Sequence, residues 1–195
     1  MKKKIIVALL ILVAFVGSAS AFDFLSAADG IKDSSIFINL GVGFGVGLYS
    51  DIVIPPVQAS VEYLLPIGIP LSVGGFFEMG MWTNNGNVTT YVGKYDETRM
   101  AFGGKVSWHV DLGLKNLDLY VSLKLGYMLW SVTNDYTDWS YSSGYYRRKV
   151  ESSYDDLFYG FALGARYFFT DAIGIYLEAG YSLVSFVNLG LAVKF

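Results

Sequence analysis

The sequence predicts an all-β protein, a closed antiparallel up-and-down transmembrane β-barrel of about eight strands. Apolar and polar residues alternate over long segments with a period of two, which is the pattern of strands whose two faces meet different surroundings. Hydrophobic residues make up 53% of the chain and charged residues only 16%, against ~25% charged residues in soluble domains. Beyond the N-terminal region, no stretch reaches the ~18 consecutive apolar residues of a membrane-spanning helix.

The alternation is regular enough to place the strands. In 117–129, 157–169 and 173–183, apolar residues occupy the odd positions and small or polar residues occupy most even ones, with Phe158 and Phe168 as apolar exceptions. The segments reach the ~9–11 residues that a tilted strand needs to cross a bilayer. A count of ten strands stays open beside the favoured count of eight. The eight predicted strands are 36–49, 56–65, 70–82, 99–112, 117–131, 155–169, 172–182 and 186–195.

The connections between these strands alternate in length. Those at 66–69, 113–116 and 170–171 are short, whereas 83–98 and 132–154 are long. Bacterial barrels place short turns on the periplasmic side and long loops outside, so the alternation supports the same topology. Prolines are tolerated where no ladder hydrogen bond is lost. All four fall at predicted strand ends: Pro55, Pro56, Pro66 and Pro70.

The N-terminal residues predict a secretory signal peptide. Residues 2–4 are three lysines, 5–17 are apolar or small, and 19–21 read Ala-Ser-Ala, which is the order of a cleaved export signal. The chain has no cysteine and a formal net charge of −3, so we expect no lipoprotein anchor, no disulfide and no nucleic-acid partner. The predicted division is a signal peptide over 1–21, a periplasmic tail over 22–35 and an outer-membrane β-barrel over 36–195.

The C-terminal strand carries a resemblance to a known family. Its outward face is apolar at every second position and ends on an aromatic residue, through Val187, Leu189, Leu191, Val193 and Phe195. With the signal peptide and the strand count, this ending resembles the small outer-membrane β-barrels, the group that includes the transmembrane domain of outer membrane protein A. The resemblance implies a place in the outer membrane of a Gram-negative bacterium, among its lipid and lipopolysaccharide. It also implies that periplasmic chaperones and the barrel-assembly machinery are partners, with this strand as the assembly signal.

Charged residues recur on the predicted inward face. Short turns place Lys105 opposite Lys124, and Glu78 is the nearest carboxylate in chain order; Arg166 and Glu178 are expected to face each other. An eight-stranded barrel has an interior just wide enough for side chains, so we interpret these residues as a salt-bridged plug, with a gated or proton-sensitive channel as the alternative. The predicted lumen charge network consists of Glu62, Glu78, Lys105, Lys124, Arg166 and Glu178.

The long connection at 132–154 is rich in tyrosine, serine and glycine, the residue types that binding loops favour. A recognition loop and a hairpin extension above the membrane are the two interpretations of this segment. Its basic triplet at 147–149 suits anions such as lipopolysaccharide phosphates. The surface-contact candidates are Tyr136, Trp139, Tyr141, Tyr145, Tyr146, Arg147 and Arg148.

Aromatic residues near the strand ends predict girdles at the two membrane interfaces. We expect Tyr49, Trp82, Trp130 and Tyr159 in the outer girdle and Tyr63, Tyr167 and Phe195 in the inner one.

Ser107, His109 and Asp111 share one predicted strand face and raise the question of a hydrolase triad. Same-face neighbours along a strand lie roughly 7 Å apart, too far for the hydrogen bonds of a triad. We therefore expect no enzyme, and no cofactor or metal site. The sequence favours an outer-membrane barrel that acts as a surface structural or adhesin-like interaction protein with a largely closed lumen and a host or environmental ligand at its loops. The alternative is a narrow porin-like protein that passes small solutes.

Overall fold

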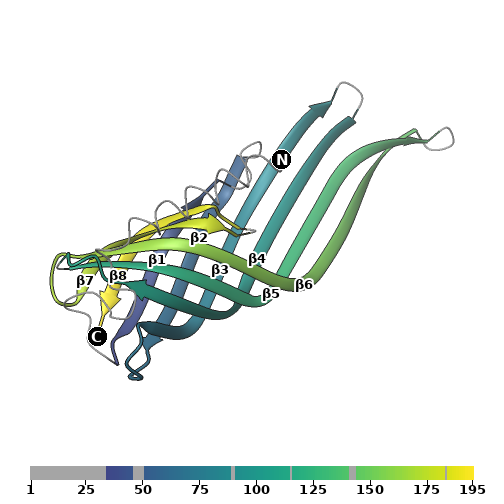
Figure 1. The fold of residues 1–195 in the computed structure, drawn as a ribbon. Coiled ribbons are helices and arrows are strands. Elements are labelled where there is room, and N and C mark those ends of the chain that lie inside the picture. The colour runs from purple at the N-terminus through teal and green to yellow at the C-terminus, as the bar shows by residue number, and fades with distance from the viewer. Residues whose placement is uncertain (1–33, 46–50, 89–90, 115, 141–143, 183) are drawn as a thin grey trace, which may run out of the picture.

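Eight antiparallel strands form a closed barrel in the computed structural model, each paired with its neighbour in the chain (Figure 1). The structure describes residues 34–45, 51–88, 91–114, 116–140, 144–182 and 184–195. The predicted signal peptide and all but the last two residues of the predicted tail lie outside this part. In the described part, no helix is long and apolar enough to cross a membrane.

The predicted fold class and the count of eight strands are confirmed. The strands are β1 (Ile36–Phe44), β2 (Asp51–Leu64), β3 (Leu71–Val88), β4 (Tyr91–Val110), β5 (Leu117–Ser140), β6 (Gly144–Phe168), β7 (Ile173–Tyr181) and β8 (Val187–Lys194).

Side chains alternate between the outside of the barrel and its lumen. Along β7, Ile173, Ile175 and Leu177 are exposed, whereas Tyr176 and Glu178 are buried. The exposed face is thus apolar and the buried face polar, the reverse of a soluble protein. This distribution suits strands with hydrocarbon outside and a polar lumen inside. The apolar belt marks the part of the barrel that crosses the membrane.

The barrel closes where β8 meets β1. Their register runs without a break from Phe37 opposite Lys194 to Phe44 opposite Val187. Closure matters because lipid offers no partner to a backbone N–H or C=O, so an open sheet edge inside the bilayer would be costly.

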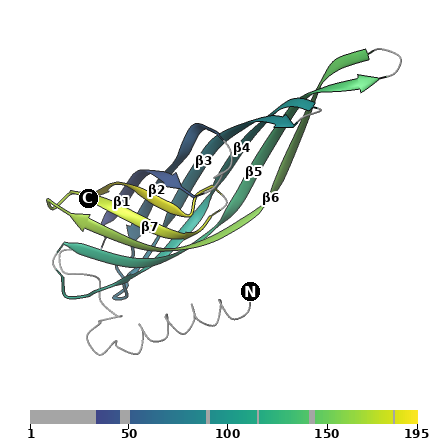
Figure 2. The ribbon, with the colours of Figure 1, turned by 90° about the horizontal axis from the view of Figure 1, so that it is seen from above.

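Four strands continue far beyond the others. β3 to β6 have 18 to 25 residues, whereas β1, β7 and β8 have eight or nine. Their outer parts, 83–88, 91–98, 131–140 and 144–155, form one sheet that we call the outer wall. Figure 1 and Figure 2 show it rising past the ends of the short strands.

The outer wall corrects the prediction of two long loops. β3 and β4 stay paired up to Val88 and Tyr91, and β5 and β6 up to Ser140 and Gly144. The pattern of apolar alternation ends where the strands leave the membrane, because both faces of the wall meet water, but the backbone ladder continues. The described residues of 132–154 therefore form a paired hairpin extension, and this pairing does not test whether the segment recognises a ligand.

The β1–β2 region also differs from the prediction. β1 ends at Phe44 in the described part, and β2 begins at Asp51 rather than 56. Pro55 and Pro56 lie within β2, where its register with β3 shifts twice between Ile52 and Val57. A bulge tolerates residues that cannot donate a ladder hydrogen bond.

Gly190 lies on β8 at the seam that closes the barrel. A Cβ atom there would lie 2.1 Å from the carbonyl oxygen of Leu40 and 2.4 Å from the Cα of Gly41. Both neighbours are backbone atoms of β1, so they have little room to shift.

We expect Gly190→Ala to lower the free energy of unfolding by about 1–3 kcal/mol, the usual effect of overpacking. The measurement is the urea midpoint of the folded band in heat-modifiable gel migration from detergent. Gly104→Ala is the matched control, because its Cβ would lie 3.8 Å from the nearest atom, the carbonyl oxygen of Leu125. Equal midpoints for the two variants would show that the seam is not tightly packed.

Candidate functional site

Two buried apolar clusters lie in the barrel, one toward each end. At the end with the short turns, the turn-end cluster consists of Phe37, Leu64, Phe168, Tyr176 and Ala192. At the end with the outer wall, the wall-end cluster consists of Phe76, Trp82, Ala101, Phe158 and Val184, with Met128 packed against it. Polar and charged side chains fill the space between them, and most are fully buried.

The charged side chains between the clusters form one connected chain of alternating sign. Lys124 Nζ lies 2.7 Å from Glu78 Oε1 and 3.2 Å from Glu178 Oε2. Lys105 bridges Glu178 to Glu62, at 3.2 Å from Glu62 Oε1. In order of contact the charge chain runs through Asp118, Arg166, Glu62, Lys105, Glu178, Lys124 and Glu78.

Arg166 anchors the turn end of the charge chain. Its guanidinium donates to Asp118 Oδ2 at 2.8 Å and pairs with Glu62. It also lies over the ring of Tyr120, 4.0 Å from the centroid, and over Phe37, 4.6 Å from the centroid. A fully buried guanidinium thus has two carboxylates and two aromatic faces as partners, which offset the loss of its hydration.

Neutral side chains satisfy the remaining carboxylate oxygens. Glu178 accepts from Gln58 and Tyr120, each at 2.9 Å. Glu62 accepts from Ser107 at 2.5 Å and from Asn39 at 3.3 Å. Buried carboxylates with this many donors are held in one geometry.

The structure places all six predicted lumen charges in this chain. Lys105 and Lys124 are opposite neighbours in the β4–β5 register, as expected. The expected pair of Arg166 and Glu178 is wrong, because the β6–β7 register places Arg166 opposite Tyr176. A register change of two residues keeps every side chain on its face but changes its partner.

His109 is the residue whose surroundings the sequence did not reveal. Its Nδ1 lies 2.7 Å from Asp118 Oδ1, and its Nε2 lies 2.9 Å from Ser72 Oγ. The expected separation of Ser107, His109 and Asp111 holds, since Ser107 bonds to Glu62 and Asp111 accepts from a turn N–H. The only sequence signal for Ser72 and Asp118 as partners of His109 is that both are polar residues on inward positions.

Ser72, His109 and Asp118 make the contacts of a catalytic triad, but a substrate cannot reach them. All three are fully buried. The imidazole contacts the rings of Phe37 and Tyr120, whose centroids are 5.6 and 5.9 Å away. A substrate carbonyl cannot approach Ser72 in this packing. In the described part, no group of three or more His, Cys, Asp and Glu side chains is arranged to hold a metal ion.

The outer wall has two different faces. The face that continues the lumen side carries aromatic residues and arginine, including Tyr95, Arg99 and Tyr136. The guanidinium of Arg99 lies near the rings of both Trp82 and Trp130, 5.6 and 5.0 Å from their centroids. These two tryptophans therefore belong to the lumen side.

The other face of the wall continues the outside of the barrel and is covered by ion pairs. Lys94 and Asp96 lie 2.8 Å apart, and Arg147 Nε donates to Asp135 at 2.7 Å. The hydrogen bond from Arg147 lowers the pKa of the Asp135 carboxyl. Such exposed pairs keep the face hydrated and contribute little to stability.

The predicted surface contacts divide between these two faces. Tyr136 and Arg148 lie on the lumen-side face, whereas Arg147 lies on the opposite one; Tyr146, Arg147 and Arg148 are all exposed. Tyr141 and the side chains of Trp139 and Tyr145 lie outside the described residues.

The outer girdle prediction is wrong for Trp82 and Trp130. Trp82 is 1% exposed and packs in the wall-end cluster, with its ring over Gly80, and Trp130 is half-buried on a lumen-facing position. Four other girdle residues point outward and are exposed: Tyr63, Tyr159, Tyr167 and Phe195. Tyr49 lies outside the described part.

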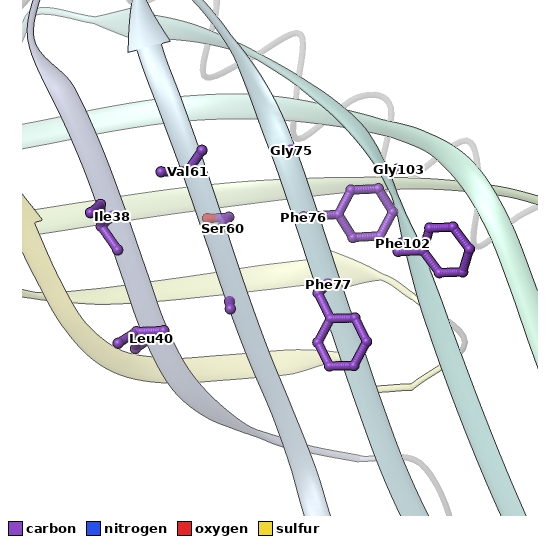
Figure 3. A pocket seen from close by; sticks show the side chains of 10 residues that line it. Ile38, Leu40, Ser60, Val61, Gly75, Phe76, Phe77, Phe102 and Gly103 are labelled. Carbon is purple, nitrogen blue, oxygen red and sulfur yellow. The ribbon is translucent and has the colours of Figure 1, made fainter.

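The apolar belt includes a shallow groove of about 480 Å³ across β1 to β4 (Figure 3). Leu40, Val61, Phe77 and Phe102 form its walls, and Gly75 contributes to its floor. Because it lies on the lipid-facing side, we assign it to the membrane contact surface. On β8, Val187, Leu189, Leu191 and Phe195 of the predicted assembly signal are exposed on this surface, and Val193 is half-buried there.

A closed barrel of eight strands with an apolar exterior and a filled polar interior is the architecture of the small outer-membrane β-barrels. The chain has this architecture. No protein-family model matches the sequence, and no curated protein matches it.

Among solved structures, the chain is similar to the crystal structure of Ail, the attachment invasion locus protein of Yersinia pestis. The identity is 13% and the TM-score 0.41, over 84% of this chain and 100% of that chain. It is also similar to the structure of Ail in complex with the heparin analogue sucrose octasulfate. There the identity is 15% and the TM-score 0.48, with the same coverage.

Arg166→Met should strongly destabilise the barrel, because it leaves Glu62 and Asp118 buried without their shared cation. Removing one partner of a buried ion pair costs about 3–5 kcal/mol, which we expect to see as a lower urea midpoint of the heat-modifiable band. Arg147→Met removes a pair at a guanidinium that is 77% exposed, and it should leave the midpoint unchanged. A wild-type midpoint for Arg166→Met would contradict the role assigned to the charge chain.

Proposed function

We propose that the chain is an outer-membrane surface interaction protein, with the barrel as a sealed anchor and the outer wall as the binding element. Residues 1–21 serve as the cleaved export signal in this proposal, and β8 serves as the signal for barrel assembly. The observation that carries the proposal is the free edge of β6. β7 pairs with β6 only from Phe161 onward, so the described part places no strand beside the outer half of β6.

Backbone hydrogen bonds indicate which groups face this edge. The N–H of Phe168 donates toward β5, to Asn116 O at 2.9 Å, whereas that of Phe169 donates toward β7, to Ile173 O at 2.9 Å. The β5–β6 register is unbroken, so N–H groups at odd positions of β6 point to the free edge. The Leu157 N–H is capped there by the Asp156 side chain at 2.7 Å.

The stretch from Arg147 to Asp155 therefore presents backbone donors and acceptors to water. Such an edge is a template on which an extended segment of another protein adds as a further strand. Three consecutive cations, Arg147, Arg148 and Lys149, lie at its outer end. Two of them already have acidic partners, Arg147 with Asp135 and Lys149 with Glu151. The exposed Arg148 favours a partner strand that carries an acidic residue at that end.

Passage of solutes through the barrel is the less supported function. The lumen between the two apolar clusters is filled by paired charges, and Lys105, Glu62 and Glu178 are each 1% exposed or less. A filled and paired interior leaves no aqueous path of the kind that larger porins have.

Ser153→Pro tests the free edge directly. Position 153 directs its N–H away from β5, so proline removes a donor from the edge and none from the β5–β6 ladder. We expect bacteria that display this variant to lose adhesion to an immobilised panel of host-surface proteins to which wild-type cells adhere. The folded band in heat-modifiable migration should stay unchanged.

A wall-shortened variant provides the second arm. Asn134 and Val150 are opposite each other, so an Asn-Gly turn that joins them removes 135–149 and leaves the barrel intact. Adhesion should also fall in this variant. Undiminished adhesion of both variants would contradict the proposal.

A further inference from the structure

The charge chain has an odd number of members and does not balance by itself. We first count the described buried charges between the two apolar clusters without His109. They are four carboxylates and three cations. The carboxylates are Glu62, Glu78, Asp118 and Glu178, and the cations are Lys105, Lys124 and Arg166. The buried Glu97 is not part of this set, because it pairs with Arg99 on the wall side. One negative charge is left over, and an uncompensated buried charge is strongly unfavourable.

The hydrogen bonds of His109 identify the missing cation. Nδ1 faces Asp118 Oδ1, a carboxylate oxygen that only accepts, so Nδ1 donates. Nε2 faces the hydroxyl of Ser72, which has a single proton. Ser72 Oγ lies 3.1 Å from Glu62 Oε2, a second carboxylate that only accepts, and donates its proton there. The hydroxyl oxygen is then the acceptor for His109, so Nε2 donates as well.

The groups around the imidazole suit a cation. Asp118 from β5 contacts it, and Glu62 from β2 is one hydroxyl away through Ser72 of β3. The ring of Phe37 from β1 stacks on it, and the ring of Tyr120 from β5 lies beside it at a tilt of 42°.

Lys194 of β8 is half-buried at the turn end, with its Nζ 4.6 Å from the centroid of the Phe168 ring, and is not one of the buried side chains counted above. Two buried permanent cations approach from the other elements, Arg166 from β6 and Lys105 from β4. Both lie over the Tyr120 ring, 4.0 and 5.1 Å from its centroid. Each of these cations also contacts a carboxylate, Arg166 through Asp118 and Lys105 through Glu178. Their charge is therefore already matched and leaves the charge deficit unfilled.

We propose that the lumen is a binding site for one proton, held on His109 as an imidazolium between Asp118 and Ser72. With this proton the charge chain has eight members, alternates in sign from His109 to Glu78 and is neutral. Loss of the proton leaves a net negative charge sealed between the two apolar clusters. The proton thus stabilises the filled lumen by neutralising the charge chain. The proton site lies in the barrel interior and does not depend on the proposed function of the outer wall.

Nitrogen NMR of the folded protein in detergent micelles tests the protonation directly. His109 is the only histidine of the chain, so selective ¹⁵N-histidine labelling gives a single imidazole. We expect a directly bound hydrogen on both ring nitrogens at pH 7. A ring nitrogen without hydrogen at pH 7 would overturn the proposal, because a protonated carboxyl would then balance the charge.

A double-mutant cycle supplies an independent readout. His109→Asn removes the proposed charge and should lower the urea midpoint of the folded band. Adding Asp118→Asn removes the matching negative charge and should restore much of the loss. Adding Glu97→Gln instead, outside the charge chain, should restore nothing. A midpoint that falls further with Asp118→Asn would contradict the proposal, since it would mean that Asp118 serves Arg166 alone.

Discussion

The constraint on which this structure depends is the pairing of charge inside a narrow closed barrel. Eight strands leave room for side chains and little else, and a buried apolar cluster packs toward each end. Every buried charge must therefore find its partner across the lumen. Arg166, Lys105 and Lys124 each contact two carboxylates, and these contacts tie six of the eight strands together, β2 to β7. The charge chain thereby connects the strands through the barrel interior, as the hydrophobic core connects the elements of a soluble protein.

The same strands serve two different surroundings along their length. Inside the membrane, β3 to β6 present apolar residues outward and polar residues to the lumen. Beyond it, the ladder continues as the outer wall, and the outward face becomes a set of exposed ion pairs such as Lys94 with Asp96. The free edge of β6 belongs to the outer wall and lies in water, where unpaired backbone groups are tolerated. The β1–β8 seam lies in lipid, where unpaired backbone groups are not tolerated, and there the barrel is closed.

Much of this could be predicted from the sequence, and the exceptions have physical reasons. A period of two fixes which face each residue occupies, and short turns fix near neighbours such as Lys105 and Lys124. The partners of Arg166 could not be predicted, because a register shift of two residues preserves the face and changes the contact. Trp82 was assigned to the lipid interface by its residue type, although its even position on β3 places it in the lumen. The wall was missed because apolar alternation disappears when both faces of a sheet meet water.

The central claim is that the barrel is a sealed anchor. Conductance of the purified, folded protein in planar lipid bilayers tests this claim most directly, with an open porin as the positive control for insertion. We predict that the wild-type protein inserts and gives no stable open current, because paired charges and two apolar clusters fill its lumen. A large, stable current through the wild-type barrel would contradict the account.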